Sequence, residues 1–446
     1  MTLSRRIGFI STRFEGTDGV SLETAKWAAV LERMGHTCSY FSGKCDRPEE
    51  KCYLVPEAFY RHPDIDAINQ TVYTGNWGRL HRERNIHPVT GELHQDFFSV
   101  YIRPEKITRA IMDLKGYFKE HLYKFAQQFR LEALIVENAL TIPINLPLGL
   151  ALTEFIAETG YPVIAHHHDF YWERQRFLNN SVQDYLAAAF PPGLPSIRHV
   201  VINSVQAKQL ASRTGIVSIV IPNVMDFDSP PTPVDGYAYS ARADLGLTPD
   251  QYLILQPTRI IQRKGIEHAI ELTRRLGLPA ELVISHAAGD EGTDYEKRIR
   301  EFAALLQVKI NFESAIVGDR RGITPEGRKI YALADIYPLA DLVTYPSAIE
   351  GFGNAFLEAI YYKRPLVVNN YSIYETDIKP KGFKVIEFDG FINDATLEHA
   401  RRLLLHPEEA AMYAEHNYLL ARRYYSFNVL ERRLQTLLAD CFGELI

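Results

Sequence analysis

A glycine-rich loop in the C-terminal half carries the residues best suited to chemistry. Glu350 and Glu358 stand eight positions apart within Tyr345-Pro-Ser-Ala-Ile-Glu-Gly-Phe-Gly-Asn-Ala-Phe-Leu-Glu358. An apolar stretch ends at Tyr345 and a helix-like stretch begins at Ala355, which is typical of a strand, a loop and a helix. Helix N-termini bind phosphate, and carboxylates accept hydrogen bonds from vicinal hydroxyls. The loop therefore predicts a site for a phosphate or a polar sugar, and an acidic first helical turn without function is the alternative.

A second loop gathers cations after another apolar stretch. It reads Gln256-Pro-Thr-Arg-Ile-Ile-Gln-Arg-Lys-Gly265, with Arg259 and Lys264 five positions apart. A diphosphate leaving group gains negative charge, and two cations beside it stabilise the transition state. Arg263 is a further cation to which the sequence assigns no role. Surface charges at a helix start are the alternative interpretation.

Three histidines follow the predicted strand 162–165, in the run His166-His167-His168-Asp169. Adjacent residues of an extended chain point in opposite directions, so they make a poor metal cage. No Asp-x-Asp metal motif follows a strand, and no pair of side chains is typical of a covalent nucleophile with its base. We therefore expect no metal and no covalent intermediate. For His166 and His167 a structural role with a backbone hydrogen bond is the favoured interpretation.

Together these motifs closely resemble the retaining nucleotide-sugar glycosyltransferases of family 4, which have the GT-B fold. The resemblance covers nearly the whole chain, is strongest over 256–365 and is weakest over about 44–130. It implies that the catalytic residues are His168, Arg259, Lys264 and Glu350. It implies that the donor-binding residues are Gly19, Gly351, Phe352, Gly353, Asn354 and Glu358.

The resemblance also implies what each residue does. Arg259 and Lys264 bind the diphosphate, Glu350 lies at the donor hexose, and Glu358 holds the ribose hydroxyls. His168 lies near the C6 hydroxyl of the donor sugar, with His167 as the reserve candidate if the register differs by one residue.

The first loop of the chain, around Gly19, matches the glycine loop of the family. The usual glycine pair is Asp18-Gly19 here, which puts the acceptor side in doubt. A turn glycine that needs a positive φ is the alternative interpretation of Gly19.

The reaction implied is metal-independent, retaining transfer of a hexose from a nucleoside-diphosphate sugar, of the GDP-mannose or UDP-glucose type. The acceptor is a small polar molecule, a glycan or a lipid-linked sugar, and no cofactor is expected because the nucleotide sugar is a substrate. The alternatives are a GT-B relative acting as an epimerase or phosphorylase, and an inactive nucleotide-sugar-binding module. We find no signature of a pyridoxal phosphate lysine, and the complete motif set argues against an inactive module.

The predicted fold is α/β, with two Rossmann-like doubly wound domains that face a central cleft. Residues 1–227 form the acceptor domain, 228–424 form the nucleotide-sugar domain, and a C-terminal helix in 425–446 returns to the first domain. The linker is the proline-rich stretch 228–236. Alternating apolar stretches predict the strands and helices of both domains. A helix is also expected around 329–334, and the first helix is expected to begin near Leu22.

Residues 44–100 interrupt the alternation of strands and helices. We interpret them as an insertion with a small antiparallel element and a hairpin turn at 88–92. Flat aromatic rings suit the apolar faces of sugars, so Tyr73 and Trp77 are candidate acceptor residues, with Asp169 beside the histidines. A packing cap without function is the alternative.

Composition limits the function classes further. The 446 residues have a net charge of −6, which argues against a nucleic-acid partner. The predicted helix 104–130 is basic and amphipathic, and a solvated face is favoured over contact with a membrane surface. The N-terminus lacks a signal peptide, and we expect a cytoplasmic protein whose four cysteines are reduced. Cys45 and Cys52 could lie close together, but a disulfide is the less favoured interpretation.

Overall fold

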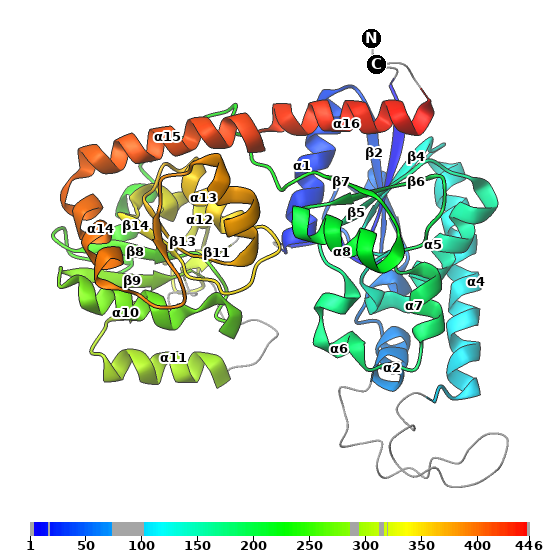
Figure 1. Ribbon diagram of the computed structural model, residues 1–446, viewed down its shortest axis with the longest axis horizontal. Coiled ribbons are helices and arrows are strands. Elements are labelled where there is room, and N and C mark those ends of the chain that lie inside the picture. The colour runs from blue at the N-terminus through cyan, green and yellow to red at the C-terminus, as the bar shows by residue number, and fades with distance from the viewer. Residues whose placement is uncertain are drawn as a thin grey trace, which may run out of the picture. The chain divides into compact units, whose positions relative to one another are not determined.

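The computed structural model of the protein describes residues 4–16, 18–73, 102–285, 294–311, 316–318 and 320–443. The chain divides into two compact units (Figure 1). Unit 1 comprises residues 1–202, 206–221 and 430–446, and unit 2 comprises residues 203–205 and 222–429. Each unit is built on its own parallel sheet, so the predicted α/β class with two Rossmann-like domains is confirmed.

The sheet of unit 1 has seven parallel strands in the order β3-β2-β1-β4-β5-β6-β7. Their bounds are β1 (Arg6–Ile10), β2 (Thr37–Ser42), β3 (Cys52–Leu54), β4 (Ala133–Glu137), β5 (Val163–His167), β6 (Ile197–Val201) and β7 (Ser218–Val220). The strand order reverses between β1 and β4, and ligands of doubly wound sheets bind beyond the strand ends at such a point. A ligand of this unit is therefore expected at the loop after β1 and the residues at the end of β4.

Helices cover both faces of this sheet (Figure 1). Their bounds are α1 (Gly19–Arg33), α2 (Pro63–Val72), α4 (Glu105–Gln128), α5 (Leu146–Thr159), α6 (Gln175–Leu178), α7 (Gln183–Ala189), α8 (Ser204–Thr214) and α16 (Phe427–Phe442). The C-terminal part of α16 belongs to unit 1, where Glu431 pairs with Arg33 at 2.6 Å. The guanidinium of Arg5 also lies 4.1 Å from the centre of the Phe442 ring.

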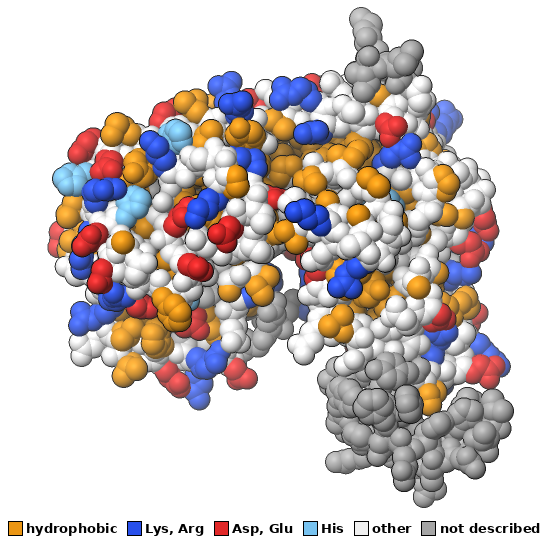
Figure 2. Space-filling view, in the orientation of Figure 1, with side chains coloured by type: hydrophobic (Ala, Val, Ile, Leu, Met, Phe, Trp, Pro, Cys, Tyr) orange, Lys and Arg blue, Asp and Glu red, His pale blue; other side chains and the backbone are white. Residues whose placement is uncertain are grey.

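The basic side chains of α4 face acidic partners rather than open solvent alone. Lys115 and Lys119 both pair with Glu154 of α5, and Lys119 also pairs with Glu158 at 2.9 Å. Among the residues that the structure describes, no helix combines the length and the apolar character that crossing a membrane requires. On the face drawn in Figure 2, acidic and basic side chains are interspersed, as expected for a chain of small net charge.

Unit 2 has a six-stranded parallel sheet in the order β10-β9-β8-β14-β15-β16. Its strands are β8 (Tyr252–Gln256), β9 (Ala280–Ile284), β10 (Ile310–Asn311), β14 (Leu342–Tyr345), β15 (Leu366–Asn369) and β16 (Ile386–Phe388). Its helices are α9 (Ala241–Asp244), α10 (Ile266–Leu276), α11 (Asp294–Leu305), α12 (Leu333–Ile336), α13 (Asn354–Tyr361), α14 (Asp394–Leu405) and α15 (Pro407–Tyr425). The order reverses between β8 and β14, so the loops after these two strands meet at the sheet edge where ligands bind.

Two local predictions were wrong. The helix expected around 329–334 is instead strand β13 (Lys329–Ala332) followed by α12, and β13 pairs with β11 (Val317–Gly318) and β12 (Gly322–Ile323) in a small separate sheet. The described part of the expected insertion contains β3, which extends the main sheet in parallel to β2. Residues 74–100, with the hairpin turn of the expected antiparallel element, lie outside the described residues, so that element stays a prediction.

The second wrong prediction concerns the start of α1. The helix begins at Gly19 rather than near Leu22, because the carboxylate of Asp18 accepts hydrogen bonds from the amides of Val20 and Ser21. A side-chain cap of this kind satisfies donors that the first helical turn would otherwise leave free. Gly19 is therefore a helical residue rather than a turn glycine with a positive φ.

Candidate functional site

The loop after β14 brings two of the predicted residues, Lys264 and Glu350, into direct contact in unit 2. The ammonium of Lys264 forms an ion pair with Glu350, and Arg263 binds the other carboxylate oxygen of Glu350 at 3.2 Å. Arg263 also donates to the carbonyl of Ile349 at 3.2 Å, which gives this cation the structural role that the sequence did not assign. The side chains of Lys264 and Glu350 are only 12% and 9% exposed, so the pair is held in a largely desolvated place.

Two glycines make this arrangement sterically feasible. Gly265 has φ +60°, and a Cβ there would lie 2.5 Å from the carbonyl oxygen of Pro346. Gly353 has φ +124°, and a Cβ there would lie 2.7 Å from the hydroxyl of Tyr371. That hydroxyl donates to the carbonyl of Phe352 at 2.7 Å and fixes the loop just before α13. The glycines are therefore required by backbone conformation and by close packing.

The cations of this site are electrostatically coupled. Burial lowers the pKa of Lys264, with Glu350 opposing the shift and Arg263 and Arg259 adding to it. Burial alone would raise the pKa of Glu350, but Lys264 and Arg263 outweigh it and lower that pKa, so the carboxylate stays ionised. Arg259 is exposed and has no ion pair among the described residues. Arg259 and Lys264 thus place two positive charges close enough to influence each other, and their binding of a diphosphate stays a prediction.

The second glutamate of the loop lies on α13. The hydroxyl of Tyr337 donates to Glu358 at 2.7 Å, which orients the carboxylate. Gly351, Phe352, Gly353 and Asn354 connect the two glutamates, and Asn354 is the first residue of α13. Its amide side-chain oxygen accepts a hydrogen bond from Asn223 at 2.7 Å. The structure thus places Arg259, Lys264, Glu350 and Glu358 on two adjacent loops and one helix of the same unit.

In unit 1 the predicted glycine loop is organised by Asp18. Besides capping α1, its carboxylate pairs with Arg13 at 2.8 Å and accepts from the hydroxyl of Ser21 at 2.7 Å. The segment around Asp46 also braces this loop, since its carboxylate accepts from the amide of Gly16 at 3.1 Å. Beside it, Cys52 donates to the sulfur of Cys45, and both thiols are free. Gly19 itself is fixed as the first residue of α1.

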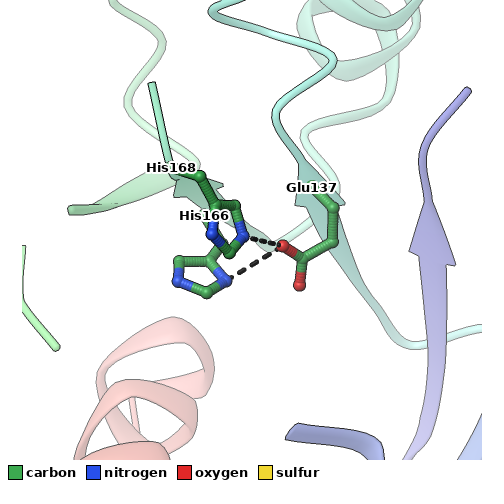
Figure 3. Close-up of side chains that lie close together, drawn as sticks. All are labelled: Glu137, His166 and His168. Carbon is green, nitrogen blue, oxygen red and sulfur yellow. Dashed lines mark hydrogen bonds and ion pairs between the residues drawn. The ribbon is translucent and has the colours of Figure 1, made fainter. Parts of the chain in front are cut away.

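A buried acid–histidine cluster lies at the carboxyl ends of β4 and β5 (Figure 3). His168 Nε2 donates to Glu137 Oε2 at 2.9 Å, and His166 Nδ1 lies 2.9 Å from the same oxygen. The side chain of Glu137 is 0% exposed. Parallel pairing explains the contact, because Glu137 of β4 is the register partner of His166 of β5. Glu137 is not among the residues predicted from the sequence, although a charged residue that ends a buried strand was a visible signal.

The backbone of His168 is held as firmly as its side chain. Asn138 has φ +58°, and its side-chain oxygen accepts from the amide of His168 at 2.7 Å. The amide of Gln206 donates to the carbonyl of His168 at 2.9 Å. A rigidly held imidazole at the end of a parallel strand is the kind of group that positions a reacting centre.

His167 points to the opposite face of β5. Its Nε2 lies 2.9 Å from Nδ1 of His199 on β6, and both side chains are buried. Burial lowers the pKa of His167 well below its ordinary value. A backbone hydrogen bond was expected for His166 and His167. Instead the His166 side chain contacts Glu137 and the His167 side chain contacts His199. His167 therefore shares neither the face nor the partner of His168.

Charge within the cluster follows from its contacts. Burial would raise the pKa of Glu137, but His166 and His168 outweigh it and lower the pKa to about 2. Burial would lower the pKa of His168, but the hydrogen bond and the charge of Glu137, together with the charges of Glu23 and Asp169, outweigh burial and raise it. The pKa of His166 is lowered by burial. The cluster thus holds an ionised carboxylate against an imidazole that gains a proton readily.

The same three side chains offer ligand atoms that Zn²⁺ accepts. One carboxylate oxygen and two imidazole nitrogens lie within 4.8 Å of one another. This set was not predicted from the sequence, because the argument against a metal concerned only the three adjacent histidines. The hydrogen bond from His168 and the close contact with His166, both to Oε2 of Glu137, are the interactions that these three side chains form in the structure. Metal independence remains a prediction.

The predicted acceptor residues lie near this cluster or outside the described residues. Asp169 follows His168 and pairs with Arg174 at 2.6 Å. Tyr73 is buried, donates to the carbonyl of Pro143 at 2.9 Å and packs edge-on against Phe177. Tyr73 is thus part of a core, and its acceptor role stays a prediction. Trp77 lies outside the described residues.

Comparison with known proteins identifies the kind of enzyme. Residues 240–419 match the family described as Glycosyl transferases group 1. A mannosylglucosylglycerate synthase of Thermotoga maritima is 30% identical, over 96% of this chain and 98% of that protein. A mannosylglucosylglycerate synthase of Petrotoga mobilis is 31% identical, over 85% of this chain and 86% of that protein.

Solved structures support the fold. A glycosyltransferase of Rickettsia africae superposes with a TM-score of 0.64 at 14% identity, covering 98% of this chain and 99% of that one. The Anabaena protein HepE, solved with UDP-glucose, gives a TM-score of 0.61 at 11% identity, covering 98% of this chain and 100% of that one. At such identities the likeness shows the GT-B fold alone. The family match and the two relatives above show more: the chain belongs to the group 1 glycosyl transferases, the family of the mannosylglucosylglycerate synthases.

Proposed function

We propose that the protein transfers a mannosyl unit from a nucleoside-diphosphate mannose to a hydroxyl of glucosylglycerate, with retention of anomeric configuration. The acceptor and sugar follow from two relatives named mannosylglucosylglycerate synthase, one of which aligns with 96% of this chain. The observation that carries the transferase chemistry is the buried Lys264–Glu350 pair beside Arg259 in unit 2. These groups suit a negatively charged leaving group next to a sugar.

In this proposal the residues of unit 2 bind the donor. Arg259 and Lys264 neutralise the diphosphate, and Glu350 accepts hydrogen bonds from the hexose. Glu358, oriented by Tyr337, accepts hydrogen bonds from the ribose hydroxyls. The amides of Gly351, Phe352 and Gly353 face the same ligand at the start of α13, where a helix N-terminus favours an anion.

The chemical step is a front-face displacement of the family 4 type. The bond between the anomeric carbon and the diphosphate oxygen breaks as the acceptor oxygen approaches from the same side. The departing diphosphate takes the proton of the acceptor hydroxyl, so no separate base is needed. His168, held by Glu137, positions the donor sugar through its C6 hydroxyl. Neither a metal ion nor a resident cofactor takes part in this scheme.

The test is an assay that combines each donor with each acceptor. GDP-mannose and UDP-glucose are incubated with glucosylglycerate, with glucose and without an acceptor, and the product is analysed by mass spectrometry and proton NMR. We expect a mannosyl product only with GDP-mannose and glucosylglycerate, and an α-linkage from the α-linked donor. A β-linked product would contradict retention. Neither transfer nor donor hydrolysis with any pair would favour an inactive binding module.

A further inference from the structure

Arginine side chains gather in unit 1 beside the histidine cluster. Arg174 pairs with Asp169, the residue that follows His168. The guanidinium of Arg13, in the loop after β1, lies 5.7 Å from the centre of the Tyr60 ring. Arg176, two residues after Arg174, interacts electrostatically with Arg174, Asp169 and Tyr60. These cations therefore extend from the first glycine loop to the end of β5, around an aromatic ring.

Arg176 differs from its neighbours in forming no ion pair with a carboxylate among the described residues. Arg13 pairs with Asp18 and Arg174 pairs with Asp169, whereas no carboxylate of the described residues pairs with Arg176. Burial and the charge of Arg174 lower the pKa of Arg176, and its side chain stays open to solvent. Because the charge of Arg174 repels that of Arg176, an anion that joins the two cations lowers their electrostatic energy. A ligand can supply that anion.

The surroundings of Arg176 indicate the shape of the ligand. Its guanidinium lies 4.5 Å from the centre of the Phe177 ring, a cation–π contact that favours this placement of the side chain. A guanidinium fork matches the two oxygens of a carboxylate. The hydroxyl of Tyr60 has no hydrogen-bond partner among the described residues and can donate to the same group.

We propose that Arg176, assisted by Arg174 and Tyr60, binds the carboxylate of an acidic acceptor, the glycerate end of glucosylglycerate. This inference rests on the proposed function and assigns the acceptor group that unit 1 recognises. Asp169, held by Arg174, is then free to accept hydrogen bonds from the sugar hydroxyls beside His168. The site selects acidic acceptors over neutral glycosides of the same size.

The test compares binding and turnover for three acceptors: glucosylglycerate, glucosyl-3-phosphoglycerate, which adds a phosphate, and the neutral glucosylglycerol, which has a hydroxymethyl group in place of the carboxylate. Arg176→Gln removes the charge and Arg176→Lys keeps it. Arg109→Gln is the matched control, because Arg109 is an exposed arginine of α4 that pairs with Glu105 of the same helix. Binding is measured by calorimetry without donor, turnover is measured with GDP-mannose, and thermal unfolding verifies that each variant is folded.

We expect Arg176→Gln to weaken binding of both acids, and to raise their KM, by about 10- to 100-fold, the usual effect of losing hydrogen bonds between charged groups. Binding of glucosylglycerol, donor hydrolysis and the Arg109→Gln variant should be unchanged, and Arg176→Lys should retain a preference for acids. A wild type that binds glucosylglycerol as tightly as glucosylglycerate overturns the inference. A loss confined to the phosphorylated acceptor overturns the assignment to the carboxylate.

The calorimetry separates this inference from the proposed function. If no mannosyl product forms although glucosylglycerate binds and Arg176→Gln weakens that binding, the carboxylate site stands and the proposed reaction falls. If mannosyl transfer occurs and Arg176→Gln binds all three acceptors as the wild type does, the reaction stands and the carboxylate site falls.

Discussion

Glu137 Oε2 and His168 Nε2 lie 2.9 Å apart at the ends of two neighbouring parallel strands, both buried. Within the described part of the chain, the carboxylate of Glu137 forms ion pairs with His166 and His168. Any effect of Glu137 on the reaction therefore acts through an imidazole. This relationship makes Glu137 a positioning residue: it fixes the orientation of His168 and the nitrogen that carries its proton. An experiment can distinguish this positioning of His168 from a merely structural role of Glu137.

We expect Glu137→Gln to lower kcat by about 10- to 100-fold, because small displacements of a positioned group have effects of this size. Nucleotide affinity should be unchanged, since the cations proposed to bind it lie in unit 2. Loss of the negative partner lowers the pKa of His168, so any limb of the kcat profile that reports His168 should move to lower pH. Glu137→Asp should recover part of the activity. An unchanged kcat with an unchanged profile would remove Glu137 from the mechanism.

The same pair predicts how stability depends on pH. The pKa of Glu137 is lowered from 4.5 to about 2, so its stabilising effect is present above 4.5 and is lost as the pH falls toward 2. The pKa of His168 is raised from 6.5, so its effect is complete below 6.5 and is lost as the pH rises through the folded value. The difference in Tm between wild type and Glu137→Gln should therefore be largest between pH 4.5 and 6.5.

Thermal unfolding across about pH 3 to 9 measures this difference, because the range covers the plateau and extends into the loss on both sides of it. Glu105→Gln is the control, because Glu105 is exposed and pairs with Arg109 on the surface of α4. Exposed pairs contribute little, so its Tm difference should stay small and flat. A difference for Glu137→Gln that is equally flat would show that the pair contributes no pH-dependent stability.

The two loops that we propose bind the donor were predictable from sequence because their signals are local. One apolar run, two glycines and one helical stretch predict the strand, the loop and the helix around Glu350. The structure has them as β14, the loop and α13. The ion pair of Lys264 with Glu350 joins two such segments. Its existence was foreseeable only from the rule that strand ends of a parallel sheet meet at one edge.

The acid–histidine cluster was not predictable in the same way. Glu137 and His168 are separated by 31 positions, and only the pairing of β4 with β5 brings them together. The prediction for the segment 329–334 failed for a related reason, since its strand exists only through pairing with β11 and β12. Sequence periodicity describes a segment by itself, whereas strand pairing depends on partners that are distant in the chain.

Lys264→Ala should weaken the binding of GDP or UDP by about 10- to 100-fold, the expected loss for hydrogen bonds between charged groups. Removing the ammonium also leaves Glu350 with Arg263 as its remaining cation, which adds repulsion toward the diphosphate. Calorimetric titration of both nucleotides measures the effect. Lys297→Ala is the control, because Lys297 is an exposed residue of α11. Unchanged affinity for both nucleotides would exclude Lys264 from the donor site.

Exhaustive treatment with EDTA should leave transfer activity unchanged, because the scheme draws its charge stabilisation from Arg259 and Lys264. Metal analysis of the purified protein should find less than about 0.1 equivalent of zinc, a threshold well below one ion per Glu137 cluster. Stoichiometric zinc that is lost in Glu137→Gln, with activity restored only by adding metal, would instead identify Glu137, His166 and His168 as a metal centre.

Gly353→Ala should damage the donor site through the backbone. At φ +124° an alanine is strained, and its Cβ would lie 2.7 Å from the Tyr371 hydroxyl that fixes the loop. We expect a loss of stability of about 1–3 kcal/mol, the usual cost of such strain, together with weaker nucleotide binding.

Gly116→Ala is the matched control, because Gly116 lies inside α4 and an added Cβ there would have nothing within 4 Å. Alanine is favoured over glycine inside a helix by about 0.5–1 kcal/mol, so this control should gain stability. Chemical denaturation of both variants measures the contrast, and a Gly353→Ala protein as stable and as active as the wild type would show that the loop adapts to a side chain there.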